Sequence, residues 1–254
     1  MRVTEETVVE PLAHFRSPLV EKFGIPRQSG LVGSLPGRIV FRPAFRAVEA
    51  LRGIEHFDYL WLLWLFSANA HADTRSVRTV RPPLLGGNRR MGVFATRSPF
   101  RPNNIGLSSV RLERVEWDTA EGPVIHVRGA DLMDGTPIID IKPYLAYADS
   151  HPGARSGFVD EVEWTRLQVV IPDALRSLLP SDEAAQLEEL LALDPRPHYQ
   201  HEPQKVYGMK FGPWNVRFRI CGTELTVEEL TCGTVLTVEE LTCGTVLTIE
   251  ELTR

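Results

Sequence analysis

The segment from Thr96 to Ser109, TRSPFRPNNIGLSS, constrains the fold of this 254-residue chain most. Pro99 and Pro102 each fix the φ angle, and we expect Gly106, in the Asn-Asn-Ile-Gly turn, to allow a backbone shape that other residues resist. The apolar run MGVFA before the segment predicts a short buried strand, and the alternating LSSVRLERVEW after it predicts a half-exposed strand. The sequence therefore predicts a rigid loop between two strands.

This loop belongs to a stretch of one charge sign. Between residues 74 and 109 there is no Asp or Glu, but there are seven arginines: Arg75, Arg78, Arg81, Arg89, Arg90, Arg97 and Arg101. Such a run is typical of a positively charged face, and guanidinium groups in a fixed loop can pair with phosphate or carboxylate oxygens. In the alternative interpretation, the loop is solvated and its arginines cap neighbouring carbonyl groups.

The acidic residues gather near the C-terminus. Residues 221–254 hold seven Glu and one Arg, a charge of −6, so the net charge of −5 leaves +1 for residues 1–220. This tail repeats eleven residues three times, as CGTELTVEELT, CGTVLTVEELT and CGTVLTIEELT, which indicates a recent duplication. The duplication explains the equal spacing of its three cysteines, Cys221, Cys232 and Cys243. These cysteines lack the CxxC spacing of zinc sites. We expect no metal site.

Composition and hydropathy favour a cytoplasmic protein. The longest nearly uncharged apolar run, Tyr59 to Ala70, is too short to span a bilayer. The N-terminus, MRVTEETVVEPL, carries acidic residues where a signal peptide would be basic and then apolar. The length suits one large β-rich domain, or one domain with a small appendage. We expect no membrane contact.

Strand patterns dominate the first part of the chain. We expect strands at residues 7–17, 37–42, 56–70, 110–117, 124–129 and 138–141, a short amphipathic helix at residues 44–54, and a flexible basic arm at residues 75–90. The run HFDYLWLLWLFSANA at residues 56–70 is the most apolar and predicts a central strand with both faces buried. Its aromatic side chains suit core packing, with a base-stacking platform as the alternative.

Beyond residue 159 the pattern changes. IPDALRSLL and SDEAAQLEELLALD predict two helices, the second capped by Ser181 or Asp182. VYGMKFG and WNVRFRI predict strands, and alternation places Arg217 and Arg219 on one face and Phe218 on the other. The predicted fold class is mainly β: a β-barrel domain over residues 1–157, a small α+β domain over residues 158–231, and a repeat tail over residues 232–254.

A second polar segment, ADLMDGTPIIDIKPYLAYADS, follows the predicted strands. Asp131, Asp134 and Asp140 lie near Lys142 in the sequence, around a DGTP turn. The regular polar residues between apolar ones suit a cleft, whereas the alternative is a turn with Asx hydrogen bonds and a surface ion pair. A metal-dependent hydrolase would use this cluster, but no His lies nearby.

Several long segments resemble the TrmO (TsaA-like, formerly YaeB) family of tRNA methyltransferases: RSPLVEKFGIPRQSG, VRPPLLGGNRRMGVFATRSPFRPNNIGLSS, DLMDGTPIIDIKPYLAYADS, DPRPHY and NVRF. The resemblance covers nearly all of residues 8–220, and the duplicated tail departs from it. It implies an S-adenosylmethionine-dependent enzyme built on a β-barrel, and the chain has no GxGxxG motif after a strand. It also implies a homodimer with the methyl donor beside the dimer interface, and a C-terminal domain that assists tRNA binding.

The resemblance also implies the substrate and the site. The substrate is the N6-threonylcarbamoyl-adenosine 3′ of the anticodon in threonine tRNA, and the product carries an added N6 methyl. The implied donor pocket uses Gln28, Ser29, Gly30, Ser67, Ala68, Arg97, Leu107, Arg128, Gly129, Ala130 and Asp131. Arg101, Asn103, Asp134, Lys142 and Tyr144 match motif positions that suit substrate placement or chemistry.

The chemistry adds roles to these residues. Methyl transfer requires alignment of the nucleophile, the methyl group and the leaving sulfur, and N6 must lose a proton. Asp134 is the candidate proton acceptor, unless no protein base is needed. Arg101 or Lys142 would pair with the threonine carboxylate. Arg75, Arg78, Arg81, Arg89 and Arg90 would contact tRNA phosphates.

Two further classes compete with this interpretation. A non-catalytic sensor that binds S-adenosylmethionine or a nucleotide would keep the donor pocket without needing the basic arm. A plain RNA-binding protein would expose aromatic platforms, and none is evident in the sequence. Bound donor without turnover would favour the sensor.

Overall fold

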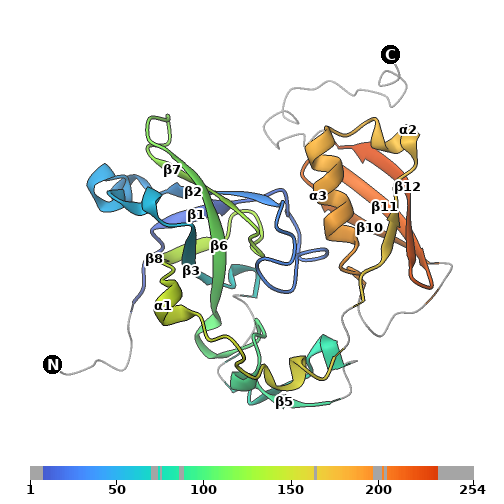
Figure 1. The fold of residues 1–254 in the computed structure, drawn as a ribbon, viewed down its shortest axis with the longest axis horizontal. Coiled ribbons are helices and arrows are strands. Elements are labelled where there is room, and N and C mark those ends of the chain that lie inside the picture. Colours follow the sequence, from blue (N-terminus) through green and yellow to red (C-terminus); the bar gives the residue numbers. More distant parts are fainter. Residues whose placement is uncertain are drawn as a thin grey trace, which may run out of the picture.

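The computed structural model describes residues 8–69, 74, 76–85, 89–162, 165–196, 202 and 205–233. It contains a closed six-stranded barrel and a separate four-stranded sheet. Figure 1 shows the barrel on the left and the C-terminal sheet, with its helix α3, on the right. The prediction of a mainly β fold with a barrel is confirmed. The boundaries 1–157, 158–231 and 232–254 stay a prediction.

Six antiparallel strands close the barrel in the order β1-β2-β7-β6-β3-β8. They are β1 (Ala13–Arg16), β2 (Pro36–Phe41), β3 (Tyr59–Leu65), β6 (Ile105–Glu116), β7 (Val124–Arg128) and β8 (Pro137–Pro143). Alternate side chains point inward, so Leu60 and Leu62 of β3 are fully buried, together with Phe15 and Ile138. A closed barrel leaves no unpaired strand edge.

The sequence predicted that the apolar run at residues 56–70 is buried on both faces, and this prediction was wrong. Its strand is limited to β3, where buried residues alternate with partly exposed ones and Tyr59 is 44% exposed. A barrel strand has only one face toward the core, so the other face stays accessible. Core packing of Leu60, Leu62 and Trp64 on the inner face is confirmed.

Other predicted elements are shorter or different. The opening strand begins at Ala13, and the expected helix at residues 44–54 is three short turns: η1 (Pro43–Phe45), η2 (Val48–Leu51) and η3 (Ile54–His56). The run MGVFA has only two strand residues, β5 (Met91–Gly92), followed by η6 (Val93–Ala95). Phe94 is 79% exposed, so this run is not a buried strand. The expected helix is interrupted by extended backbone at Ala47, with a ψ angle of 117°, and by left-handed backbone at Gly53, with a φ angle of 87°.

Short elements connect the barrel strands or follow the last of them, β8. They are η4 (Ser67–Asn69), β4 (Thr79–Val80), η5 (Pro83–Leu85), η7 (Pro102–Asn104), α1 (Ala146–Asp149) and η8 (Gly157–Val159). β4 pairs with β5, so part of the arm at residues 75–90 is an ordered ribbon instead of a flexible loop. No helix among the described residues is long and apolar enough to cross a membrane.

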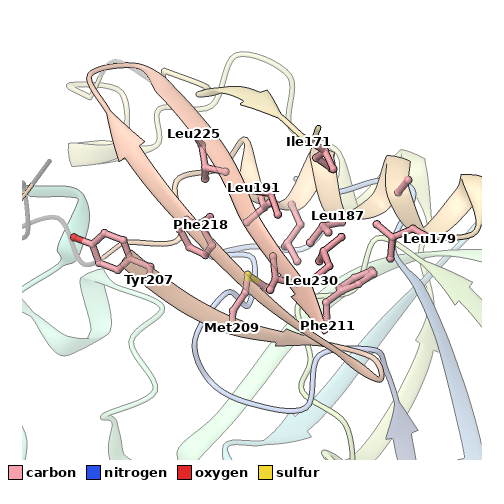
Figure 2. Packing of buried hydrophobic residues seen from close by; sticks show 14 of the residues in the cluster. Ile171, Leu179, Leu187, Leu191, Tyr207, Met209, Phe211, Phe218, Leu225 and Leu230 are labelled. Carbon is pink, nitrogen blue, oxygen red and sulfur yellow. The ribbon is translucent and has the colours of Figure 1, made fainter. Parts of the chain in front are cut away.

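The C-terminal sheet has the order β10-β11-β12-β9. Its strands are β10 (Val206–Phe211), β11 (Trp214–Cys221), β12 (Glu224–Cys232) and β9 (Gln168–Val170), and its helices are α2 (Asp173–Arg176) and α3 (Ser181–Leu191). Leu187 and Leu191 of α3 pack on strand residues that include Phe218 (Figure 2). Phe218 is fully buried and Arg217 is exposed, which confirms the predicted alternation on β11.

Three details of the C-terminal part differ from the prediction. The first predicted helix is only the four-residue α2 after β9. The N-cap of α3 is Pro180, which makes no side-chain cap, so neither Ser181 nor Asp182 caps the helix. The first tail repeat completes the β11–β12 hairpin, where Cys221 and Cys232 are exposed and free. The other two repeats, apart from Cys232 and Gly233, lie outside the described residues.

Candidate functional site: a cationic cleft at one barrel end

A cleft of about 450 Å³ opens at the end of the barrel where β3 ends and β6 begins. Its walls come from residues 22–28, 64–69, 96–107 and 131–136, which lie far apart in the sequence. Apolar side chains such as Phe66 and Leu107 form part of the lining, together with four basic residues: Lys22, Arg27, Arg97 and Arg101. The cleft has the size and the mixed lining of a small-molecule site.

The loop before β6 takes its shape from two asparagines. Asn103 and Asn104 have φ angles of 69° and 49°, and the Asn104 side chain lies 3.2 Å from Thr74 Oγ1. Asn tolerates this left-handed region better than most residues. We expected Gly106 to provide the unusual backbone conformation of this turn, and this was wrong. The positive φ angles belong to Asn103 and Asn104, and Gly106 has none. A side chain at Gly106 would instead collide with the indole ring of Trp64.

The cleft cations are held by neighbouring groups. Arg97 Nη1 donates to Gln28 Oε1 at 2.5 Å, and Lys22 Nζ donates to Ala68 O at 2.8 Å. Arg101 Nη1 donates to Thr96 O at 3.0 Å, so this arginine caps a carbonyl, as the alternative interpretation expected, while it also lines the cleft. Fixed cations of this kind can receive an anionic group of a ligand without first becoming ordered.

Asp131 is the one acidic side chain among the described residues that line the cleft. Ser108 Oγ donates to Asp131 Oδ1 at 2.5 Å, and Trp64 Nε1 donates to Ser108 Oγ at 3.0 Å. Burial raises the pKa of Asp131 above its ordinary value, and the hydrogen bond from Ser108 and the charge of Arg97 only partly oppose this shift. A buried carboxylate with a raised pKa is typical of functional sites.

The other predicted donor residues divide into two groups. Gln28, Ser67, Ala68, Arg97 and Leu107 line the cleft directly. The rest of the set, which is Ser29, Gly30, Arg128, Gly129 and Ala130, lies outside the lining.

A hydrogen bond connects Gly30 and Gly129, each of which lies two residues from a residue that lines the cleft, Gln28 and Asp131 respectively. Gly30 N donates to Gly129 O at 2.8 Å, and Gly129 N donates to Leu35 O at 2.9 Å. Both glycines have positive φ angles, of 81° and 76°, which side chains disfavour. Gly30 and Gly129 therefore connect the two chain segments that carry the lining residues Gln28 and Asp131.

Asp134, Lys142 and Tyr144 are not brought to the cleft. Asp134 Oδ1 accepts from Ser17 N at 3.1 Å, 117 residues away in the chain, and Oδ2 lies 3.5 Å from Arg16 Nη1, so Asp134 forms an ion pair with Arg16 instead of an Asx turn. Lys142 pairs with Asp140 at 2.7 Å. Lys142 and Tyr144 lie near the far end of β8, roughly 20 Å or more along the strand from Thr136, which lines the cleft.

The basic arm lies beside this site in sequence and remains largely accessible. Arg78, Arg81, Arg89 and Arg90 are exposed, whereas Arg75 lies outside the described residues. Arg89 pairs with Glu161 at 3.0 Å, and Arg90 donates to Thr79 Oγ1 at 2.9 Å. Asn103 is also exposed and does not line the cleft. The arm offers a positive surface.

Sequence reasoning missed two residues that position Asp131. Trp64 was assigned only to the core, and Ser108 lies in a run chosen for its alternation. The signal available was a polar residue at an inward position of β6: Ser108 is 1% exposed between the buried Gly106 and Val110. A buried hydroxyl requires a hydrogen-bond partner, which here is Asp131.

Comparisons with known proteins agree with this architecture. The tRNA-methyltransferase O N-terminal domain matches residues 14–150, and the TrmO C-terminal domain matches residues 164–232. A tRNA (adenine(37)-N6)-methyltransferase of Escherichia coli (strain K12) is 40% identical over 219 residues, 83% of this chain and 92% of that protein. A protein of the same name from Eikenella corrodens is 47% identical over 165 residues, 65% of this chain and 91% of that protein.

A solved structure extends the likeness to three dimensions. The crystal structure of TrmO from Pseudomonas aeruginosa has a TM-score of 0.70 and 34% identity to this chain. The match covers 91% of this chain and 99% of that one.

Proposed function

The chain belongs to the TrmO family of tRNA methyltransferases, and from this premise we propose that it methylates N6 of adenosine 37 in tRNA with S-adenosylmethionine as donor. The finer substrate is the threonylcarbamoyl form of that adenosine in threonine tRNA. The observation that carries the proposal is the cleft at the barrel end, which four basic side chains line together with a single, partly buried carboxylate, Asp131.

The cleft residues fit the donor. Its volume of about 450 Å³ lies in the range of small-molecule sites. Arg97 and Lys22 suit the donor's carboxylate, whereas Phe66 and Leu107 suit its adenine ring. When bound, the donor supplies a methyl group on a sulfonium centre. The residues Gln28, Ser67 and Ala68 complete the proposed donor pocket, with Ser29, Gly30, Arg128, Gly129 and Ala130 as support behind it.

Asp131 is the better proton acceptor of the two candidate aspartates. Once bound, the donor would supply its methyl group to N6, and a residue of this chain would then have to accept the N6 proton. Asp131 faces the cleft, whereas Asp134 is engaged by Ser17 and Arg16 outside it. A raised pKa brings a carboxylate closer to the strength that a general base needs near neutral pH. Arg101 remains available for the threonine carboxylate.

Within one protomer, Lys142 and Tyr144 lie too far from the cleft for the role in substrate placement or chemistry that the family motif implies. Both lie at the opposite end of β8 from the cleft. The ring of Tyr144 packs near those of Tyr59 and Trp61, at centroid distances of 6.1 and 5.8 Å. We assign Lys142 and Tyr144 to the surface of that end.

The chain is proposed to act as a homodimer. Leu63 and Leu107 are paired neighbours on the outer face of β3 and β6, and so are Leu65 and Ile105. Leu107 and Ile105 are 50% and 39% exposed, and both line the cleft. An apolar face that continues into the donor site suits a second copy of the chain.

Placing a charge in this face is expected to separate the subunits and weaken donor binding. Leu63→Asp should give a monomer in analytical ultracentrifugation, because a carboxylate buried in an apolar interface loses hydration without a partner. Val48→Asp, at an exposed position of η2, is the matched control. A monomeric Leu63→Asp protein with full activity would refute the dimer proposal.

The basic arm is proposed to bind tRNA phosphates. Replacing Arg78 and Arg81 together by Ala should weaken tRNA binding similarly for all sequences, and should lower the slope of log K against log salt by about 1.5. Filter binding across a range of salt concentrations measures this slope. Arg52→Ala, an exposed arginine in the turns at the other barrel end, is the control. An unchanged slope in the double variant would remove the arm from the tRNA interface.

Methyl transfer from labelled S-adenosylmethionine tests the function directly. Threonine tRNA with and without the threonylcarbamoyl group would be compared, and the methylated nucleoside identified by mass spectrometry. Incorporation only into the modified tRNA supports the reaction and the anchoring of the threonine carboxylate. Incorporation into neither tRNA, with donor still bound, would favour the sensor interpretation.

A further inference from the structure

The loop that carries Gln28 is built on both parts of the molecule. Residues 17–35 connect β1 to β2 within the barrel, yet Leu19, Val32 and Leu35 are each 1% exposed and belong to the core of the C-terminal sheet. We name residues 17–35 the donor loop. Its apolar side chains therefore hold it against the second domain, while its residues 22–28 form one wall of the cleft.

Glu189 of α3 binds the donor loop directly. Its Oε1 accepts from Gly33 N at 3.0 Å, and its Oε2 accepts from Ser34 N at 3.3 Å and from the Ser34 hydroxyl. One carboxylate thus satisfies two consecutive backbone N–H groups and a side chain. Hydrogen bonds to an ionised acceptor are stronger than those between neutral groups.

A short chain of contacts leads from this point to the cleft. Ser34 O accepts from Arg128 Nη1 at 2.8 Å, and Leu35 O accepts from Gly129 N at 2.9 Å. Gly129 O in turn accepts from Gly30 N at 2.8 Å. Gly30 lies two residues from Gln28. The Gln28 side chain lines the cleft and accepts a hydrogen bond from Arg97.

Other contacts tie the donor loop to the second domain at separate points. Gly212 N donates to Pro18 O at 2.7 Å, and Lys210 N donates to Glu21 Oε1 at 2.8 Å. Arg166 Nη2 donates to Leu31 O at 3.3 Å. These contacts therefore anchor the donor loop at its start and along its length. Glu189 anchors its end, at Gly33 and Ser34.

We propose that Glu189 is a positioning residue for the methyl donor, through which the C-terminal domain holds the donor loop in its binding shape. This inference rests on the proposed function of the cleft. Without Glu189, Gly33 and Ser34 lose their acceptor, and the loop must be ordered when the donor binds. That ordering weakens affinity without changing the reacting groups. The expected effect is therefore on donor binding and not on the chemical step.

The test compares Glu189→Gln with Glu188→Gln on the same helix. Gln at position 189 keeps the size of the side chain but places an NH₂ group against N–H donors, whereas Glu188 only pairs with Arg176 on the surface, at 2.7 Å. We expect the dissociation constant for S-adenosylmethionine, measured by calorimetry without tRNA, to rise about tenfold for Glu189→Gln. We expect kcat at saturating donor to stay within about twofold of the wild-type value.

A second variant keeps the proposal falsifiable if the first is unstable. Ser34→Ala removes only the hydroxyl contact to Glu189 and should give a smaller rise in the same constant. Equal donor affinity for the wild type, Glu189→Gln and Ser34→Ala would overturn the positioning role. A variant that loses kcat, donor affinity and thermal stability at the same time would also overturn the positioning role, because such a combined loss indicates general unfolding. A wild type that binds no donor would instead overturn the proposed function.

Discussion

Replacing Asp131 by Asn is expected to lower kcat for methyl transfer by about 10²- to 10⁴-fold, the usual contribution of a general base. Asn has the same shape and can still accept the hydrogen bond from Ser108, so the cleft should keep its structure. What Asn cannot do is take a proton from N6. The loss should appear at saturating donor and saturating tRNA, which separates it from weaker binding.

The same substitution is expected to stabilise the ligand-free protein. Burial raises the pKa of Asp131 in the folded state, so the folded protein keeps this proton at pH values where the unfolded chain has released it. The resulting stability is fully present below the unfolded pKa of about 4. It is lost as the pH rises through the higher folded pKa. Above that pH the wild type bears the cost of a buried charge, whereas the Asp131→Asn variant does not.

The measurements are a pH–rate profile and thermal unfolding of both proteins. In the wild type, kcat should rise as Asp131 ionises, with a midpoint above the ordinary range of an aspartate, and Asp131→Asn should abolish this limb. Asp134→Asn is the control, since Asp134 lies outside the cleft. An active Asp131→Asn protein together with an inactive Asp134→Asn protein would reverse the assignment.

The two aspartates show where sequence reasoning ends. The DLMDGTP motif brings Asp131 and Asp134 into one short segment, and both suit a cleft on composition alone. Which carboxylate faces inward depends on the turn: Asp134 N donates to Leu19 O and Gly135 has a φ angle of 75°. The partner of Asp134 N lies more than a hundred positions away in the chain. A single sequence carries no local signal for such a contact.

Periodicity predicted the barrel because its signal is local. Alternation along β6 is set by which side chains face the core: Gly106, Ser108 and Val110 are buried, whereas Ile105, Leu107 and Arg111 are exposed. Distance along a strand is harder to judge. Lys142 lies close in sequence to Thr136, yet an extended chain separates them by roughly 20 Å, so a motif that continues along β8 leaves the cleft.

Contacts between the domains are the least predictable part. Glu189 lies on the exposed-looking acidic stretch of α3, and its partners are 155 and 156 residues away. Helix periodicity explains why Leu187 and Leu190 face the core, but it gives no reason to connect Glu189 with Gly33. The predicted division at residue 157 likewise places the donor loop with the barrel, whereas Leu19 and Leu35 pack in the second core.

A side chain at Gly106 is expected to disturb both the core and the site. Gly106 pairs directly with Trp64 across β6 and β3, and a Cβ atom there would lie within 2.7 Å of three atoms of the indole ring. Trp64 is only 7% exposed, so the ring can move only by displacing its neighbours. Overpacking of this kind costs about 1–3 kcal/mol, which lowers the melting temperature of a chain of this size by roughly 3–10 °C.

The indole ring also connects this clash to activity. Trp64 Nε1 donates a hydrogen bond to Ser108 Oγ, and Ser108 Oγ donates one to Asp131 Oδ1. Displacement of the indole ring should therefore break both hydrogen bonds. Gly106→Ala should therefore lower kcat as well as stability. Gly92→Ala is the matched control, because that glycine has a φ angle of −56° and open space around the position of a Cβ atom.

A double-mutant cycle identifies the clash itself. Trp64→Leu removes the ring atoms that a Cβ at position 106 would meet, at its own cost in packing. If the ring causes the loss, Gly106→Ala should cost clearly less stability in the Trp64→Leu background than in the wild type, since contacting residues are not additive. Equal costs in both backgrounds, measured by denaturant unfolding, would show that the glycine is required for the β6 backbone and not for the packing of Trp64.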